Sequence, residues 1–286
     1  MGRNGQDRVR DPRLSRARPP LVAVAHGSRD PRAAATVTDL LSQVRARAAA
    51  HGLGGLDVRA AFLDHCAPSL PQALRAVLAD TGDGAGRAVV VPLLLTAAYH
   101  SKADIPAQIA AAGAGPELDV IVGDTLGPHP FLLRLLDRRV TESGGERAAT
   151  SVVLAAAGSS DPAANAAVAA TAAAWERAGG WRRVVPAYAS AAAPTPADAV
   201  AALRAADPGG RVAVATYLLA PGYFADKIRA AALGAGADAV SGVLGAAPET
   251  ADVVLERYAA AAAGRLWSDP KYPERAVVAT QLGNCS

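Results

Sequence analysis

Cysteine and aromatic residues are scarce in this chain, and each shortage removes a class of protein from consideration. The 286 residues include only two cysteines, Cys66 and Cys285, which lie far apart and lack CxxC spacing. They support neither a disulfide framework nor a thiolate metal site. Aromatic residues make up 4% of the chain, and none is interleaved with the arginines near the N-terminus. Without aromatic side chains for base stacking, a nucleic-acid partner is not predicted.

Long apolar runs and nucleotide-binding motifs are also missing. No apolar run approaches the ~20 residues that span a bilayer, and residues 1–20 lack the apolar core of a signal peptide. We therefore expect a cytoplasmic protein without a membrane partner. No P-loop and no GxGxxG follows any apolar run, so a nucleotide cofactor is not predicted. Residues 1–19 carry six arginines but no hydrophobic periodicity, which indicates a disordered basic arm.

An alternation of strand and helix patterns fills the rest of the chain. From residue 20 onward, short apolar runs alternate with longer Ala/Leu patterns, which is typical of βαβ units and a parallel sheet. In the first half this predicts strands at 20–25, 57–63, 87–95 and 118–123, and helices at 31–50, 68–80, 103–113 and 129–143. In the second half it predicts strands at 151–156, 183–189, 211–219 and 239–244, and helices at 162–178, 195–206, 224–235 and 248–263.

The glycine-rich and charged segment 141–150 indicates a boundary between the two halves. We therefore predict an α/β fold of two tandem doubly wound domains, each with a four-stranded parallel sheet. The domains are placed at 20–145 and 150–265, with a tail at 266–286. A chain with two such matched halves is expected to be a monomer.

The two halves also match residue by residue, which indicates internal duplication. HGSRDPRAAA from His26 matches AGSSDPAANA from Ala157, and LLLTAAYH ending at His100 matches YLLAPGYF ending at Phe224. In the same alignment Ser190 stands where the first half has Asp64. The second half has thus lost the side chains that can bind metal. We expect it to fold independently, to enclose a cleft, and to leave one site per chain in the first half.

Polar residues follow three of the predicted strands in the first half. His26 ends the first strand, Asp64 and His65 end the second, and His100 follows the third. Parallel strands deliver their carboxyl ends to one edge of the sheet, so these groups are expected to converge. Two histidines and a carboxylate can hold a borderline divalent metal and leave positions open for exchange. A single histidine is more often a packing or capping residue, but the convergence favours a site.

Several of these residues have an alternative role. Asp64 can be a helix cap, and adjacent strand residues face opposite sides, so only one of Asp64 and His65 is expected to face the site. His129, in LGPHP, lies either on the same rim or at a helix entry. His51 precedes Gly52, which is typical of a charge at a helix C-terminus before a glycine cap.

Positive charges lie near the same rim. Arg29, Arg32 and Lys102, together with the N-termini of the helices, would suit a substrate that carries several carboxylates. The alternative for each of them is ordinary solvated surface.

Four motifs of the first half resemble a known family. They are AHGSRDPRA, AFLD before an APS helix entry, VPLLLTAAYHSKADIP and LGPHP. They resemble the sirohydrochlorin chelatases of siroheme and cobalamin synthesis, class II tetrapyrrole chelatases, in their long two-domain bacterial form. The resemblance covers about residues 20 to 265. It implies a lyase that inserts a divalent metal into a tetrapyrrole and keeps no permanently bound cofactor.

The resemblance also implies roles for individual residues. His26 and His100 match the metal-site histidines of the family, and Asp64 falls where the family usually has glutamate. We expect the two histidines to bind the metal and accept pyrrole protons, with Asp64 orienting a histidine or joining the proton relay. The residues expected to bind the substrate are Ser28, Arg29, Tyr99, Lys102 and His129.

The identity of the metal and the class of activity both have alternatives. Fe²⁺, which gives siroheme, is favoured because nothing in the sequence indicates dedicated cobalt handling; a cobaltochelatase of cobalamin synthesis is the alternative. A carrier of a tetrapyrrole or metal that does not catalyse insertion would need the cleft but no proton acceptors. A phosphotransfer or hydrolase site at His26 lacks a partnered nucleophile.

Overall fold

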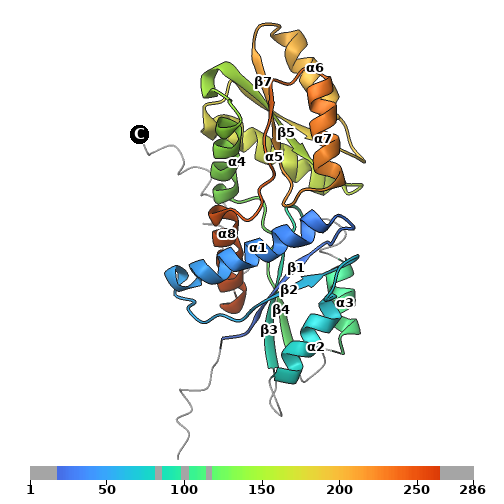
Figure 1. Ribbon diagram of the computed structural model, residues 1–286, viewed down its shortest axis with the longest axis vertical. Helices are drawn as coiled ribbons and strands as arrows, with labels where there is room; N and C mark the ends of the chain where they lie inside the picture. The colour runs from blue at the N-terminus through green and yellow to red at the C-terminus, as the bar shows by residue number, and fades with distance from the viewer. Residues whose placement is uncertain (1–17, 81–85, 98–102, 114–117, 265–286) are drawn as a thin grey trace, which may run out of the picture.

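Two four-stranded parallel sheets flanked by helices make up the structure (Figure 1). The computed structural model describes residues 18–80, 86–97, 103–113 and 118–264. In these residues the strand orders are β2-β1-β3-β4 and β6-β5-β7-β8. The predicted α/β class is therefore confirmed. Residues 1–17 of the predicted arm and all of the predicted tail lie outside the described residues.

The elements follow the predicted order in both halves. In the first half they are β1 (Leu21–Ala25), α1 (Pro31–Arg47), η1 (Ala48–His51), β2 (Val58–Phe62), α2 (Leu70–Asp80), β3 (Gly86–Pro92), α3 (Ile105–Ala111), β4 (Leu118–Val122) and α4 (Pro130–Glu142). In the second half, after a short 3-10 turn η3 (Arg147–Ala149), they are β5 (Thr150–Ala156), α5 (Pro162–Gly179), β6 (Arg183–Tyr188), α6 (Pro196–Ala206), β7 (Arg211–Thr216), α7 (Tyr223–Gly234), β8 (Ala239–Val240) and α8 (Pro248–Ala262).

The last two strands are shorter than predicted. The predicted strand 211–219 ends at Thr216, and the predicted strand 239–244 ends at Val240. Side chains replace the ladder there: Ser241 Oγ accepts a hydrogen bond from the Thr216 N–H at 3.0 Å, and Thr216 Oγ1 donates to the Ser241 carbonyl at 2.9 Å. Since both bonds use side chains, they interrupt the regular backbone ladder at this point; isolated backbone bonds, such as Leu244 N–H to the Leu218 carbonyl at 2.9 Å, follow beyond it.

The internal repeat extends to the helix entries. Asp30 caps α1 by accepting from the Arg32 N–H, and Asp161 caps α5 by accepting from the Ala163 N–H, each at 2.9 Å. A proline follows each cap at the first helical position, where its missing N–H costs nothing. The repeated Asp-Pro pair therefore starts the same helix in both halves.

The last helix of each half packs on the sheet of the other half. Helix α8 contacts strands β3 and β4 of the first sheet and helix α1 beside them, whereas α4 contacts β7 of the second sheet (Figure 1). The indole N–H groups of Trp175 and Trp181 both donate to Asp137 of α4 at 2.7 Å. The packed units therefore differ from the predicted segments 20–145 and 150–265. We revise the expectation that the second half folds independently, because that segment lacks α4.

Polar contacts fix the exchanged helix α8. The guanidinium of Arg47 donates to both carboxylate oxygens of Asp252 at 2.6 Å, and His51 Nε2 lies 2.9 Å from the same carboxylate. The predicted glycine cap after His51 is confirmed, since Gly52 adopts a φ of +68°. Arg257, which is 4% exposed, donates to the carbonyls of Leu126 and Pro128.

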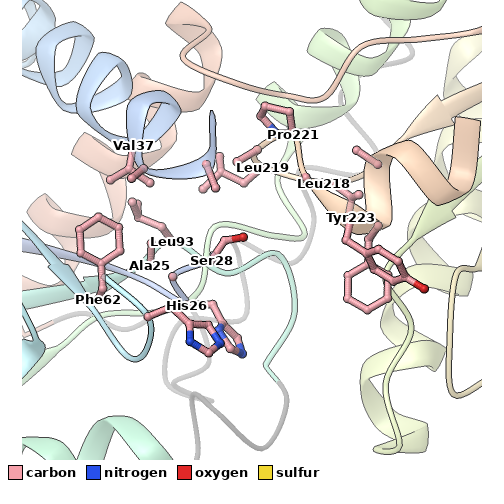
Figure 2. Close-up of a pocket in the computed structure, with 18 of the residues that line it drawn as sticks. Ala25, His26, Ser28, Val37, Phe62, Leu93, Leu218, Leu219, Pro221 and Tyr223 are labelled. Carbon is pink, nitrogen blue, oxygen red and sulfur yellow. The ribbon is translucent and has the colours of Figure 1, made fainter. Parts of the chain in front are cut away.

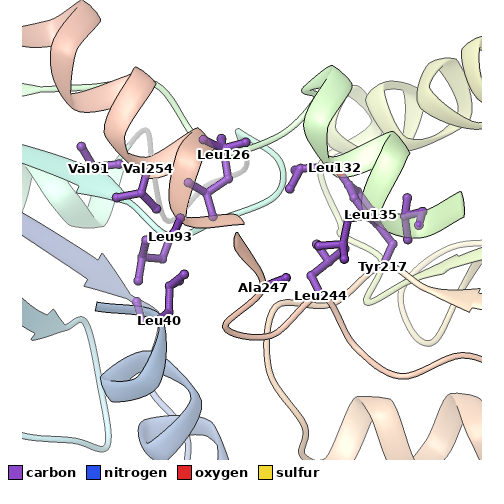
Figure 3. Close-up of a cluster of buried hydrophobic side chains, with 14 of the residues drawn as sticks. Leu40, Val91, Leu93, Leu126, Leu132, Leu135, Tyr217, Leu244, Ala247 and Val254 are labelled. Atoms are coloured by element: carbon purple, nitrogen blue, oxygen red, sulfur yellow. The ribbon is translucent and has the colours of Figure 1, made fainter. Parts of the chain in front are cut away.

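One hydrophobic core runs through both halves as a result. Its side chains include Leu40 from α1, Leu135 from α4 and Val254 from α8 (Figure 3). Each sheet also has one smaller cluster on its outer face. In the first sheet it lies under α2 and α3, and in the second sheet it lies under α6 and α7. Within the described ranges, none of the helices combines the length and apolar character needed to span a bilayer.

Candidate functional site

A cleft of about 590 Å³ lies between the two halves. Its first wall is built at the carboxyl ends of β1, β2 and β3 and at the start of α1; its second wall is built after β5 and β7 and at the start of α7 (Figure 2). This volume is in the range of small-molecule sites, which is about 300–1,000 Å³. The residues of the first wall are Ala25, His26, Gly27, Ser28, Arg29, Ala33, Ala34, Val37, Phe62, His65, Leu93 and Leu94. Those of the second wall are Ala157 and residues 218–225.

His26 stands directly after β1, as predicted, and is an exposed residue of the first wall. The loop that carries it is held against the end of β2, because the Asp64 N–H donates to the His26 carbonyl at 2.9 Å. Gly27 permits this approach: it has a φ of +91°, and a Cβ there would lie 1.8 Å from the Asp64 carbonyl oxygen. The backbone therefore fixes where the imidazole enters the cleft.

Ser28 and Arg29 also line the first wall. Ser28 Oγ accepts a hydrogen bond from the Asp30 N–H at 3.0 Å, and the Ser28 carbonyl accepts from Cys66 Sγ at 3.2 Å. These contacts tie the serine to the start of α1. A hydroxyl, a guanidinium and a helix N-terminus thus meet at one edge of the cleft, where a carboxylate would be bound favourably.

Asp64 and His65 lie side by side at the end of β2. His65 is on the cleft wall, whereas the Asp64 side chain is 63% exposed and contacts its neighbour. Asp64 Oδ1 accepts from the His65 N–H at 2.7 Å, and Oδ2 lies 3.3 Å from His65 Nε2. His65 has a φ of +61°, and its repeat counterpart Ala191 has a φ of +57°. The left-handed turn belongs to the scaffold of both halves, but only the first half places an imidazole on it.

His129 has the helix-entry role that the sequence left open. It is 7% exposed and caps α4, with Nδ1 accepting from the Phe131 N–H at 3.2 Å. Its Nε2 lies 3.1 Å from a carboxylate oxygen of Glu256 in α8. Burial lowers the pKa of His129 and so favours the neutral ring, and because Nδ1 accepts from Phe131 the ring proton belongs on Nε2. Because both nitrogens are engaged within the protein, His129 is not part of the cleft.

A pH-dependent stability is expected from this buried imidazole. The folded pKa of His129 is below its ordinary value of 6.5, so below that pH the unfolded chain binds a proton that the folded chain does not. Stability should then fall as the pH drops below 6.5 towards the lower folded pKa, by up to about 1.4 kcal/mol per pH unit. Urea denaturation should show a smaller dependence in His129→Asn, which keeps a capping side chain but does not titrate.

The window from pH 5 to 7 separates this effect from that of Glu256. Hydrogen bonding to His129 lowers the pKa of Glu256 below its ordinary 4.5. Its contribution to stability is therefore fully present above pH 4.5 and is lost only at lower pH. An identical pH dependence of wild type and His129→Asn between pH 5 and 7 would contradict the neutral, buried state of this histidine.

Three predicted site residues, Tyr99, His100 and Lys102, lie outside the described residues. Among the residues that the structure does describe, no three His, Cys, Asp or Glu side chains form a group that could hold a metal ion. The described part of the site is thus the wall with His26 and His65.

The second wall carries residues whose place in the site was not predicted. Tyr223 and Phe224, the repeat counterparts of Tyr99 and His100, begin α7 and line the cleft. Figure 2 shows Tyr223 on this wall. In the same turn Asp226 accepts a hydrogen bond from Arg32 of α1 at 2.6 Å, which links the walls at their rim. The repeat alignment was the one sequence signal that could have placed these aromatic residues opposite His26.

Solved structures share this two-part architecture. SirB from Bacillus subtilis with Fe³⁺ superposes with a TM-score of 0.74 at 24% identity, over 87% of this chain and 97% of that chain. CbiX, described as the terminal enzyme for biosynthesis of siroheme in denitrifying bacteria, gives a TM-score of 0.60 at 19% identity, over 85% and 99%. At these identities the likeness establishes the fold, a duplicated α/β fold of the chelatase type. The CbiX family model matches residues 20–143 and 151–261, and the chain belongs to this family.

Curated relatives match over shorter stretches. A sirohydrochlorin ferrochelatase of Priestia megaterium is 31% identical over 93 residues, which is 32% of this chain and 34% of that protein. A sirohydrochlorin cobaltochelatase of the same organism is 33% identical over 125 residues, or 43% and 38%. A cobaltochelatase of Saccharolobus islandicus is 36% identical over 89 residues, or 29% and 67%. The chain thus spans little more than a third of each Priestia protein.

Proposed function

We propose that this chain is a sirohydrochlorin chelatase, a lyase that inserts a divalent metal into the tetrapyrrole. The observation that carries the proposal is the exposed imidazole of His26 on the wall of a 590 Å³ cleft between the two halves of a CbiX-family fold. Most of the lining residues are apolar, as a flat macrocycle requires, and the imidazole and guanidinium groups of His26, His65 and Arg29 all lie on the first wall.

Insertion requires that the metal sheds its bound waters and that two pyrrole N–H groups lose their protons. Neutral imidazoles can bind the metal and accept protons near neutral pH. In the proposal each imidazole does so in turn: its one free lone pair holds the metal first and takes a pyrrole proton once the metal has passed to the macrocycle. His26 and His100 have this role, with His100 assigned from the family motif. Asp64 orients a histidine, and the 3.3 Å contact of its Oδ2 with the His65 ring nitrogen Nε2 supports that role.

The acetate and propionate groups of the substrate are assigned to the polar edge of the cleft. Ser28, Arg29 and the N-terminus of α1 lie there, and Tyr99 and Lys102 are added from the sequence. Binding of these remote groups would help to hold the macrocycle in a shape that accepts the metal. His129 is left out of the proposal because its ring is engaged with Phe131 and Glu256.

The metal is proposed to be Fe²⁺, with Co²⁺ as the alternative. Curated relatives carry both activities in their names. Affinity of a nitrogen and oxygen site rises from Fe²⁺ to Co²⁺ whatever the biological substrate, so affinity alone is not the test. Competition between the two metals at controlled free concentrations, followed by the spectra of the products, decides the assignment. A preference for Co²⁺ would make the chain a cobaltochelatase.

Anaerobic incubation with sirohydrochlorin and Fe²⁺ or Co²⁺ tests the activity itself. The absorption spectrum of the metallated product should develop much faster with protein than without it. A carrier would bind the macrocycle and leave this rate unchanged. That outcome would show that the chain is a binding protein and not a chelatase.

A monomer in the cytoplasm is proposed as the working form. One chain supplies both walls of the cleft, so no second copy is needed to complete the site. Light scattering in the presence of sirohydrochlorin should therefore give the mass of one chain. A dimer that forms on binding would contradict this.

The contact between Asp64 and His65 predicts a non-additive pair. If Asp64 acts through the His65 ring, Asp64→Asn should lower kcat in the wild type and have little effect in a His65→Gln background. Initial rates of the two single variants and the double variant provide the measurement. Equal effects of Asp64→Asn in both backgrounds would show that Asp64 acts by another route.

A further inference from the structure

Two exposed aromatic side chains form part of the cleft wall opposite His26. Tyr223 is 72% exposed and Phe224 is 38% exposed, although most other aromatic residues of the described chain are buried. Their ring centroids lie 5.5 Å apart with the planes inclined at 65°. Burial normally stabilises such residues, so their exposure inside a binding cleft calls for a partner that covers them.

The backbone beneath the two rings is held firmly. Lys227 of α7 donates to the Ala189 carbonyl at 2.6 Å, and Ile228 of the same helix is fully buried. The salt bridge between Asp226 and Arg32 connects this turn to α1 at 2.6 Å. The aromatic pair is therefore presented from a fixed helix start, which lowers the entropic cost of binding a ligand.

The first wall lies close to this helix start. At Gly222, which precedes Tyr223, an added Cβ would lie 3.8 Å from the Asp30 Cβ and 4.0 Å from Ser28 Oγ. Figure 2 shows His26 and Ser28 on one side of the cleft and Tyr223 on the other. A flat ligand between the walls would meet an imidazole on one face and aromatic rings on the other.

The repeat supports a role for the pair beyond packing. Where the first half has His26 and Asp64, the second half has the small residues Ala157 and Ser190. Where the first half has His100, the second half has phenylalanine, a larger apolar side chain that remains exposed. Loss of metal ligands alone explains the small residues, but it does not explain an exposed aromatic ring at this position.

We propose that Tyr223 and Phe224 form an aromatic platform that packs against one face of the tetrapyrrole macrocycle and presents its other face to His26. The proposal rests on the chelatase function and assigns the second half a share in substrate binding. Aromatic contacts are insensitive to the substituents at the edge of the ring, whereas Ser28 and Arg29 would read the carboxylates. In this proposal the aromatic platform of the second half supplies affinity for the macrocycle, and the polar edge of the first half sets its orientation.

The double variant Tyr223→Ala/Phe224→Ala tests the platform. Fluorescence titration with metal-free sirohydrochlorin should give a Kd raised by about 10-fold or more, which corresponds to at least about 1.4 kcal/mol. The KM for sirohydrochlorin should rise in parallel, while kcat at saturation and the Kd for Co²⁺ alone stay within about twofold, since the metal ligands are untouched. Tyr223→Phe keeps the ring and should bind as the wild type does.

Leu233→Ala is the matched control. Leu233 is 44% exposed on the same helix but does not line the cleft, so its removal should leave the Kd for sirohydrochlorin unchanged. Thermal unfolding checks that each variant is folded; if the double variant is not, Tyr223→Ala carries the test because its side chain is the more exposed.

The outcomes separate the platform from the chelatase function. A wild-type protein that does not accelerate metal insertion would overturn the function. A wild type that does, together with a double variant whose Kd for sirohydrochlorin equals that of Leu233→Ala, would overturn the platform alone. A lowered kcat with an unchanged KM would also overturn it, because the rings would then act in the chemical step.

Discussion

Replacing His26 by alanine is expected to lower kcat for metal insertion by about 100-fold or more, the effect of losing a positioned acid–base group. The side chain is exposed in the cleft and makes no contribution to the core, so stability should change by less than about 1 kcal/mol. Initial rates at saturating sirohydrochlorin and metal give the first quantity, and urea denaturation gives the second. His100→Ala is expected to act in the same way.

A matched histidine outside the cleft controls for general damage. His51 contacts Asp252 at the packing surface of α8 and does not line the cleft. His51→Ala should therefore cost stability while leaving kcat per folded molecule near the wild-type value. A near-normal kcat in His26→Ala would contradict the role of His26 in the proposed mechanism.

Gly27→Ala is expected to have a large effect on stability. The residue has a φ of +91°, which an L side chain adopts at a cost of roughly 1–2 kcal/mol, and the new Cβ would lie 1.8 Å from the Asp64 carbonyl oxygen. Because that oxygen is backbone, the end of β2 must move. We expect urea denaturation to show a loss of at least about 3 kcal/mol. Asp64 and His65 would shift with it, so kcat should fall too.

Two other glycines separate the cost of a positive φ from the cost of the steric clash. Gly52 has a φ of +68° but nothing within 4 Å of an added Cβ, so Gly52→Ala should cost only about 1 kcal/mol. Gly158 repeats the clash in the second half, with an added Cβ 1.9 Å from the Ser190 carbonyl oxygen. Gly158→Ala should match Gly27→Ala in stability yet leave the His26 loop in place. Equal stability of the Gly27 and Gly52 variants would refute the close approach.

The order of elements could be predicted because each signal is local. An Asp-Pro pair after a short apolar run starts a helix whatever the rest of the chain does, as at Asp30 and Asp161. The place of His26 follows from the same local logic, since a residue that ends a parallel strand lies at the carboxyl edge of the sheet.

The arrangement of Asp64 and His65 could not be predicted in the same way. Strand alternation told us that one of the two would face the site, but the strand ends at Phe62 and His65 takes a left-handed conformation. Once the backbone turns, the period of two no longer decides where a side chain points. Strand alternation alone therefore does not decide which of the two side chains faces the cleft.

The exchange of α4 and α8 also had no local signal. The sequence of α8 shows that one face is apolar but not which sheet covers it. Its partners lie far away along the chain: Asp252 contacts Arg47 and His51 across about 200 residues. Only the packed structure reveals such pairs.

The exchanged helix sets the order in which the chain can complete its folding during synthesis. The inner face of the first sheet is covered by α1 and α8, and α8 ends at Ala262. As the ribosome releases the chain, β1 to β4 emerge long before that helix, so the first sheet waits with apolar surface uncovered. By contrast, α4 has already been synthesised when the strands of the second sheet emerge. Contacts of such long range slow folding and extend the time at risk of aggregation. We therefore expect the half that carries His26 to be the last to become native.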